Sequence, residues 1–309
     1  MTNRNEQWKH EKDGLEILKE LPALAEKDFK EIDPGDVERL KWAGIYAQRP
    51  RDGHFLVRVK LPSGQLTAAQ AKVLVDLAAA YGKGEIQITI RQAVQIHNIT
   101  LRDAVDILPR LKAAGLSSVE ACGDVPRTIL GNPLAGVDAE ELLDTRPLVE
   151  EVFRFFLGNR DFSNLPRKFK ISISANPHDA GFARINDLAF VPARREGEAG
   201  FVAYVGGGLS AEPHLAVRLP FFIRPAEVKA VAEAVARSSA TRATARSAIT
   251  AASSTSWRTS AQSVSPRRSR HRRALCCAAA RKSPPRGTTA AFTASTRRSS
   301  RDSATSAST

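Results

Sequence analysis

The chain has 309 residues, which is enough for one large or two medium domains with a substantial core. Its formal net charge of +13 is typical of proteins that bind nucleic acid or a membrane surface. Residues 237–309, however, contain 14 Arg, 1 Lys and 1 Asp, a net charge of +14, which leaves 31 basic and 32 acidic residues in 1–236. The body of the chain is therefore close to neutral, and the charge argument for nucleic acid applies to the C-terminal segment alone.

The cysteine count and the apolar pattern narrow the class further. Only Cys122, Cys276 and Cys277 occur, which argues against a disulfide scaffold and favours a reducing compartment. No segment approaches the roughly 20 apolar residues that span a bilayer, and "MTNRNEQWKHEKDG" has no signal-peptide core. We therefore expect a cytoplasmic protein without a membrane partner.

The first elements in chain order combine helices with an alternating strand. Residues 1–44 are rich in charged residues and favour helix, as in "GLEILKELPALAEKDFKEI". "HFLVRVKLP" then alternates apolar and polar residues, which predicts a strand with one buried face. Thr67 and Gln70 have the spacing of a capping box, so a helix is predicted after Thr67 with its end at Gly82.

A second strand and a second helix follow. "EIQITI" predicts a strand on which three isoleucines face together. After "RQAVQIHNI", Thr100 and Asp103 predict the start of a helix that includes Pro109 and ends near Gly115. Strands and helices in this order predict an α+β fold, about half of a ferredoxin-like sandwich or slightly more.

The next region begins near Leu116 with a loop-rich segment. A helix is predicted over "PLVEEVFRFFL", closed by Gly158, and another starts at Pro225. Between them, "KFKISIS", "DLAFVPA" and "GFVAYVGG" are strand candidates.

The composition changes at Arg237. Of the last 73 residues, 17 are Ser, 16 Ala, 14 Arg and 11 Thr, and neither helical nor strand periodicity persists, so the segment is disordered by composition. Three interpretations are open. The segment is a nucleic-acid-binding arm, a solvated linker, or the product of a shifted reading frame, because GC-rich codons displaced by one base tend to encode these residue types.

Several cations of the body lie beside apolar strands or turns. Arg91 ends the strand "EIQITI", Arg127 follows "CGDVP" in a loop, and Arg167, Lys168 and Lys170 belong to "LPRKFKISIS". A buried cation needs an anionic partner, and carboxylates nearby in sequence are few. The cations together indicate an anionic ligand, although for any one of them taken singly a solvated surface residue is the better explanation.

Four segments occur in order over roughly residues 45–236: "TIRQAVQIH", "CGDVPRTILGNPLAG", "LPRKFKISIS" and "GFVAYVGGGLS". They resemble the successive motifs of the sirohaem-dependent nitrite and sulfite reductases. The resemblance implies an oxidoreductase that reduces sulfite or nitrite by six electrons from a ferredoxin-type donor. It also implies sirohaem, a tetrapyrrole with eight carboxylates, joined to a [4Fe–4S] cluster.

The resemblance also implies roles for particular residues. Lys170 stands where nitrite-preferring members tend to carry Asn, which favours sulfite. Arg91 and Arg127 would bind the oxyanion and also contact the cofactor. Lys168 and Lys170 would add charge and donate protons, and Arg167 and Gln95 would contact the macrocycle and its carboxylates.

The cluster is where the chain departs from the family. A [4Fe–4S] cluster needs four thiolates, which the family supplies from C-x5-C and C-x3-C motifs that this chain lacks. We therefore expect a truncated or misread reductase that is inactive as it stands. The alternative is a cluster-free protein that binds a tetrapyrrole or an oxyanion, or nucleic acid through its basic segment. The expected domains are a helical lead-in (1–44), a ferredoxin-like half domain (45–115), part of a sirohaem-binding domain (116–236) and the low-complexity segment (237–309).

Overall fold

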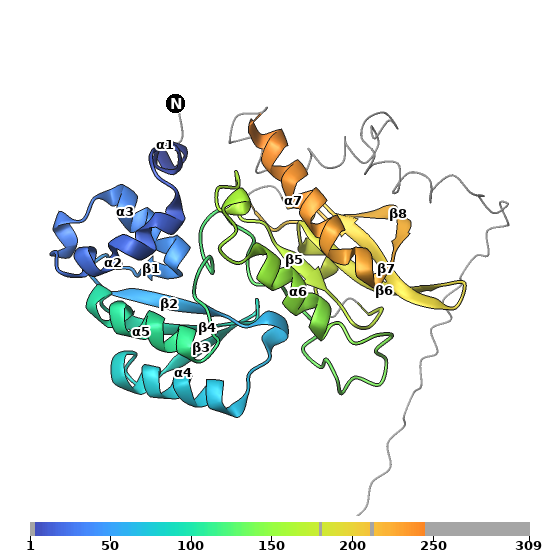
Figure 1. Ribbon diagram of the computed structural model, residues 1–309, viewed down its shortest axis with the longest axis horizontal. Coiled ribbons are helices and arrows are strands. Elements are labelled where there is room, and N and C mark those ends of the chain that lie inside the picture. Colours follow the sequence, from blue (N-terminus) through green and yellow to red (C-terminus); the bar gives the residue numbers. More distant parts are fainter. Residues whose placement is uncertain (1–3, 179–180, 211–212, 245–309) are drawn as a thin grey trace, which may run out of the picture. The chain divides into compact units, whose positions relative to one another are not determined.

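The computed structural model describes residues 4–178, 181–210 and 213–244. The chain divides into two compact units, Met1–Ser265 and Pro266–Thr309, and every described residue lies in the first (Figure 1). None of the helices in these residues combines the length and apolar character that crossing a membrane requires.

The N-terminal segment is helical, as predicted. Asp13 and Asp33 accept hydrogen bonds from backbone N–H groups at the start of their helical turns, which caps them. Ile17, Leu40 and Trp42 are buried and contribute to the first hydrophobic core. The elements are α1 (Arg4–Glu11), α2 (Ile17–Ala25) and α3 (Pro34–Arg39), with 3-10 turns at Gly14–Glu16, Phe29–Glu31 and Leu40–Ala43.

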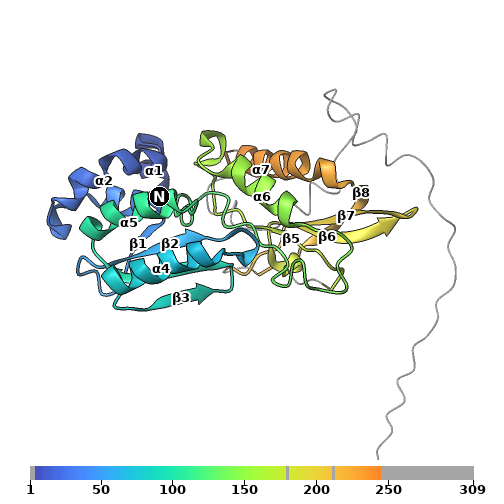
Figure 2. The same cartoon turned by 60° about the horizontal axis from the view of Figure 1, so that its bottom comes forward.

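The first sheet is antiparallel, with the strand order β1-β2-β4-β3. Both predicted capping boxes are present, at Thr67 and Thr100, and the first of the two helices ends at Gly82. These helices, α4 and α5, pack against the apolar face of the sheet (Figure 2). The elements are β1 (Ile45–Ala47), β2 (Phe55–Lys60), α4 (Ala68–Tyr81), β3 (Ile86–Thr89), β4 (Ala93–Ile99) and α5 (Leu101–Ala113).

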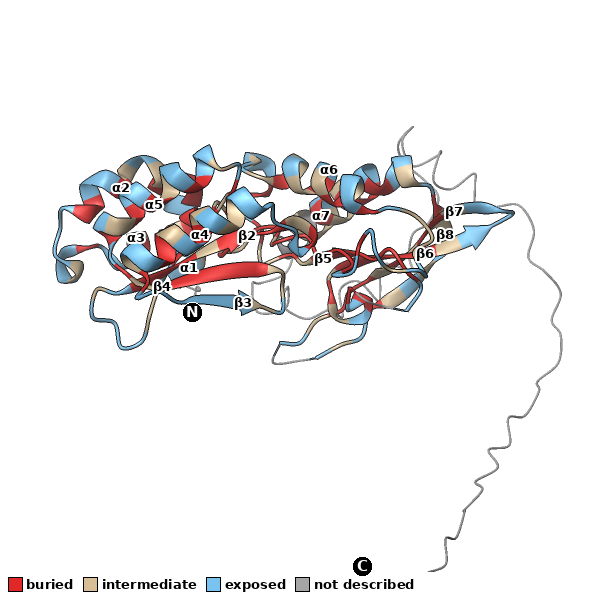
Figure 3. Cartoon of the chain, turned by 90° about the horizontal axis from the view of Figure 1, so that it is seen from below, coloured by how far each residue is buried: buried red, intermediate tan, exposed pale blue. Residues whose placement is uncertain are grey.

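Strand β3 lies at the edge of this sheet and is exposed except at Thr89, which is partly buried (Figure 3). The strand is confirmed, but it ends at Thr89, and Arg91 lies in the turn that leads to β4. The expectation that Arg91 ends the strand was therefore wrong. The turn contains Gln92 with a positive φ of 48°, which reverses the chain at this point.

The second sheet has the order β5-β6-β7-β8, with β5 and β6 parallel and the other pairs antiparallel. Helices α6 and α7 cover one face of it, and the core between them is rich in phenylalanine (Figure 1). The elements are α6 (Arg146–Phe156), β5 (Ile171–Ile173), β6 (Leu188–Arg195), β7 (Glu198–Val205), β8 (Val217–Ile223) and α7 (Val228–Thr244), which a 3-10 turn at Pro225–Glu227 precedes.

Two features of this sheet differ from the prediction. Strand β5 is shorter than "KFKISIS", so Lys168 and Lys170 precede it in an extended segment. Strand β8 was not predicted, because Pro220 interrupts its apolar pattern. At the edge of a sheet a proline is tolerated, since its missing N–H faces away from the ladder.

The basic segment begins within α7. Arg237 to Thr244 continue this helix beyond the change in composition. The interpretations of the segment as an arm, a linker or a frameshift product concern mainly residues 245–309, which lie outside the described residues.

Candidate anion-binding site

The loop with Arg127 runs beside the segment with the predicted lysines. Backbone N–H groups of Arg127 and Leu130 donate to the carbonyls of Phe169 and Ile171 at 2.8 and 3.1 Å, and Phe169 N–H donates to Val125 O at 3.0 Å. These bonds form parallel bridges that extend the pairing of β5. Arg127 is thereby held next to the extended segment that carries Arg167, Lys168 and Lys170.

A cavity of about 390 Å³ opens on this loop. Three predicted site residues line it: Arg127, Arg167 and Lys168. Residues of the N-terminal segment, including Trp8 and Trp42, also line it, and we call this part of the lining the N-terminal wall. The cavity therefore combines elements that are far apart in sequence.

Arg58 on β2 also lines this cavity, although it was not among the predicted site residues. Its Nε donates to Gln95 Oε1 at 2.9 Å and its Nη1 to Cys122 Sγ at 3.3 Å. Gln95 in turn donates to Gln87 Oε1 at 2.7 Å, so a polar chain on the sheet orients the guanidinium. The signal was available, because alternation on "FLVRVK" places Arg58 on the face opposite Val57.

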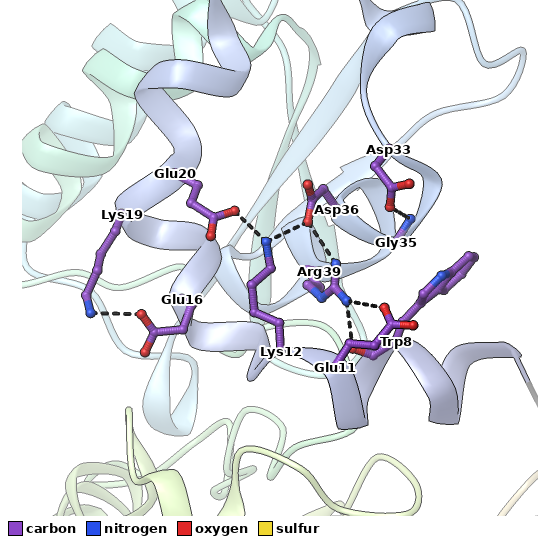
Figure 4. A network of polar contacts seen from close by, with 10 residues as sticks. All are labelled: Trp8, Glu11, Lys12, Glu16, Lys19, Glu20, Asp33, Gly35, Asp36 and Arg39. Atoms are coloured by element: carbon purple, nitrogen blue, oxygen red, sulfur yellow. Dashed lines mark hydrogen bonds and ion pairs between the residues drawn. The ribbon is translucent and has the colours of Figure 1, made fainter.

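Cations on the N-terminal wall of the cavity are paired with carboxylates. Figure 4 shows Lys12 Nζ between Glu20 Oε2 at 2.6 Å and Asp36 Oδ1 at 2.9 Å. Arg39 bonds Asp36 Oδ1 at 2.8 Å and Glu11 Oε2 at 3.2 Å. Two further lysines of this wall, Lys9 and Lys41, form ion pairs with Glu6 and Glu38.

The remaining cations of the cavity have no such partners. Within the described residues, no carboxylate oxygen lies within 4.0 Å of the charged groups of Arg58, Arg127, Arg167 or Lys168. We call these four residues the unpaired cations. Burial lowers the pKa of Arg127, and the neighbouring Arg58 and Arg167 lower it further, while Cys122 and Asp124 oppose the shift. Positive charge is thus concentrated without an ion pair to a protein carboxylate, which favours an anionic ligand.

Arg91 and Lys170 lie beside Asp187 and not among the residues lining the cavity. Arg91 donates from Nη1 to Asn186 Oδ1 at 2.9 Å and from Nη2 to Ile171 O at 3.0 Å. Lys170 N–H donates to Asp187 Oδ2 at 2.8 Å. Burial raises the pKa of Asp187 to about 6, although Lys170 and Arg91 both oppose that rise.

The cations that line the cavity also lower the pKa of Arg91 and of Lys170, which lie beside Asp187. Burial lowers the pKa of Arg91 to about 9, and the positive charge of Arg127 makes the next largest contribution to this lowering. Burial also lowers the pKa of Lys170, against the attraction of Asp187, and Arg91, Arg127 and Arg167 add to the lowering. The predicted residues therefore form one region of positive potential, in which only some members face the cavity.

This architecture defines an α+β protein that concentrates unpaired cations at a cavity. Two family models match the chain: the nitrite/sulfite reductase ferredoxin-like half domain over residues 46–114, and the nitrite and sulphite reductase 4Fe-4S domain over 122–246. Together they take in more than half of the chain. The chain belongs to the nitrite and sulfite reductase family.

Individual relatives agree with the family models. A ferredoxin–nitrite reductase of Leptolyngbya laminosa is 41% identical over 240 residues, which are 75% of this chain and 47% of the relative. A ferredoxin sulfite reductase of Mycobacterium tuberculosis is 36% identical over 252 residues, 75% of this chain and 45% of the relative. The solved NirA protein of M. tuberculosis has a TM-score of 0.71 at 35% identity, and the match covers 76% of this chain and 46% of that one. The chain spans about half the length of the curated relatives it matches.

The cationic region fits a carboxylate-rich tetrapyrrole. Within the described residues, eight buried side-chain polar atoms have no hydrogen-bond partner. Three of them belong to Arg91 or to residues within two positions of Arg91 or of its partner Ile171: Arg91 Nε, Thr89 Oγ1 and Ser172 Oγ. Such atoms are normally satisfied by a ligand or by water. An octacarboxylate would supply both the missing counter-charge and the missing acceptors.

The residues do not fit a [4Fe–4S] cluster. The cluster needs four thiolates, and the whole chain contains three cysteines. Of these, Cys122 is buried and the other two lie outside the described residues. In the part of the chain that is described, no three His, Cys, Asp or Glu side chains gather in an arrangement that could hold a metal ion.

Proposed function

We propose that the chain forms the sirohaem- and oxyanion-binding part of a ferredoxin-dependent nitrite or sulfite reductase. The observation that carries this proposal is the set of four unpaired cations that line the cavity. An octacarboxylate and an anionic substrate would both be attracted there, because within the described residues no protein carboxylate forms an ion pair with any of the four.

Each predicted residue has a role in this proposal. Arg167 and Gln95 contact the macrocycle and its carboxylates, and Arg91 and Arg127 contribute to the same binding. Arg91 and Arg127 also bind the oxyanion, and we add Arg58 to this role because it lines the same cavity as Arg127. When bound, sirohaem would supply the iron at which electrons reach the substrate.

Lys168 and Lys170 would hold the protons that the reduction consumes. Burial lowers the pKa of both ammonium groups, and neighbouring cations lower it further. A lowered pKa brings a lysine closer to neutral pH, where it transfers a proton more readily. Lys170, in place of an asparagine, favours sulfite over nitrite in this proposal.

The missing thiolates limit what this chain does alone. Without a cluster, electrons from a ferredoxin-type donor have no route through the chain to a bound sirohaem, so we propose that it is inactive in six-electron reduction. The frameshift interpretation of residues 237–309 accounts for the lack of cysteine pairs. We also propose a cytoplasmic location, because the low number of cysteines is typical of a reducing compartment. Sequencing the gene across codons 225–245 tests the frame, because a one-base correction should restore both cysteine motifs.

The same cysteine count favours a second candidate function. A cluster-free member of the family would bind a tetrapyrrole or an oxyanion without redox chemistry. A confirmed reading frame, together with tight tetrapyrrole binding and no sulfite- or nitrite-dependent electron uptake, would support this second function over the first.

Titration with sirohaem tests the binding that both candidates share. We expect the visible spectrum of sirohaem to shift on addition of the full chain and to saturate at one equivalent. Arg127→Ala should weaken binding by about tenfold, which corresponds to the loss of one charge-assisted contact. Arg194→Ala, which removes an exposed arginine from β6, should bind like the wild type. Absence of saturable binding by the wild type would refute the proposal.

A further inference from the structure

One carboxylate does lie among the unpaired cations. Asp124 lines the same cavity as Arg127, Arg167 and Lys168. Its negative charge raises the pKa of both Arg127 and Lys168, so it is close enough to attract them. A carboxylate in this place competes with an anionic ligand for the same cations.

Both oxygens of Asp124 are nevertheless engaged elsewhere. Oδ1 accepts a hydrogen bond from the backbone N–H of Lys168 at 3.1 Å. Oδ2 faces the ammonium of Lys9 at 3.3 Å. Lys9 comes from α1, 115 residues earlier in the chain, and its side chain is only 6% exposed. The competing charge is thus neutralised from outside the cluster of arginines.

Lys9 is itself firmly held in this position. Its ammonium also bonds Glu6 Oε1 at 2.6 Å and donates to Leu165 O at 3.0 Å. Leu165 is also bonded to Asp124 directly, because Leu165 N–H donates to the backbone carbonyl of Asp124 at 2.9 Å. A buried ammonium with three acceptors is costly to displace, so Lys9 fixes where the Asp124 carboxylate points.

We propose that Lys9 is a positioning residue that keeps the Asp124 carboxylate away from Arg127 and Lys168, and so leaves these cations available to an anion. The proposal rests on the anion-binding function proposed above. Removal of the ammonium would leave Asp124 to pair with the nearest cations of the cavity. Anion affinity would then fall although no residue that contacts the anion had changed.

The test uses two anions and four forms of the full chain: wild type, Lys9→Met, Asp124→Asn and the double variant. Met keeps the unbranched length of the lysine stem without its charge, and Asn keeps the acceptor for Lys168 N–H. Uroporphyrin, a metal-free octacarboxylate, is followed by its fluorescence. Sulfate, a simple oxyanion, is followed by the rise that it causes in the thermal midpoint.

We expect Lys9→Met to weaken uroporphyrin binding roughly fivefold, which is the effect of losing a favourable contact with one cation. The same variant should show a smaller sulfate-induced rise in the thermal midpoint. Asp124→Asn should bind at least as tightly as the wild type, and the double variant should recover wild-type affinity to within about twofold. A merely structural role for Lys9 predicts that the double variant stays as weak as Lys9→Met, and this result would overturn the proposal.

The outcomes separate this inference from the proposed function. Equal uroporphyrin binding by the wild type and Lys9→Met would overturn the role of Lys9 and leave tetrapyrrole binding intact. A sulfate effect that depends on Lys9 without any uroporphyrin binding would support Lys9 and refute the tetrapyrrole site. A wild type that binds neither anion overturns both.

Discussion

The side-chain amide of Gln92 pairs with both backbone polar groups of Gly131. Gln92 Oε1 accepts from Gly131 N–H at 2.9 Å, and its Nε2 donates to Gly131 O at 3.0 Å. The contact joins the turn after β3 to the segment that follows Arg127, and so relates the first sheet to the loop of the cationic site. A side chain at Gly131 would meet Ser63 Oγ at 2.3 Å, so the close approach requires glycine.

Loss of the Gln92 amide should destabilise the chain. We expect Gln92→Ala to lower the free energy of unfolding by roughly 1–3 kcal/mol, because two partly buried backbone groups lose their partner. Urea unfolding followed by circular dichroism measures this. Gln65→Ala is the matched control, since Gln65 is exposed and makes one long contact of 3.5 Å to Ala135 O. Equal losses in the two variants would contradict the role of the contact.

Arg58 should matter for anion affinity although it belongs to the first sheet. Arg58→Ala removes one of the unpaired cations, and we expect the dissociation constant for sulfate to rise about tenfold. Arg58→Lys keeps the charge but not the bonds from the guanidinium to Gln95, so an intermediate value is expected. Isothermal titration at low ionic strength gives these constants. An unchanged constant for Arg58→Ala would remove Arg58 from the site.

Asp187 should make stability depend on pH. Its pKa of about 6 exceeds the ordinary value of 3.8, so between pH 4 and pH 6 the native state holds a proton that the unfolded state has lost. Stability therefore falls as pH rises through this window. Asp187→Asn removes this dependence while keeping an acceptor for Lys170 N–H.

The advantage of Asp187→Asn over the wild type should grow from pH 4 to pH 6 and then level off at about 3 kcal/mol, the value of the shift at 1.36 kcal/mol per pH unit. Urea unfolding of both proteins at pH 4, 5, 6 and 7.5 gives the difference at each pH. A constant difference across this range would contradict the account of Asp187.

Gly14 is predicted to be intolerant of a side chain. A Cβ at this position would lie 2.2 Å from Cδ2 of Trp42, whose buried indole donates to Ser163 O at 2.6 Å. Gly14→Ala should therefore lower the thermal midpoint by several degrees, the effect of about 1–3 kcal/mol of overpacking. Gly208→Ala has nothing within 4 Å and should be nearly neutral. Similar midpoints for the two variants would contradict the packing of Trp42.

Local patterns predicted most of the fold. The capping residues Thr67 and Thr100 identified their helices because the capping bonds form within one turn of the chain. Alternation also identified the buried side of "KFKISIS", where Phe169, Ile171 and Ile173 are all buried. Strand β8 was missed because an edge strand accepts Pro220, which a central strand would not.

The site was harder to predict, because its geometry depends on contacts between distant segments. The cations of "LPRKFKISIS" stood out by their density, whereas Arg58 is a single cation in its strand, and strand alternation was the signal that could have identified it. The contact between Lys9 and Asp124 joins residues separated by 115 positions, and no local pattern encodes it. The functional roles assigned to the site residues stay predictions.

The central claim is that the unpaired cations recognise carboxylates, and a series of porphyrins tests it most directly. Uroporphyrin, coproporphyrin and mesoporphyrin carry eight, four and two carboxylates on the same ring. Fluorescence titration of the full chain should show affinity that increases with the number of carboxylates and that falls as salt is added. Affinity that is independent of carboxylate number, or that increases toward mesoporphyrin, would show that the cavity binds by apolar contact and would contradict the claim.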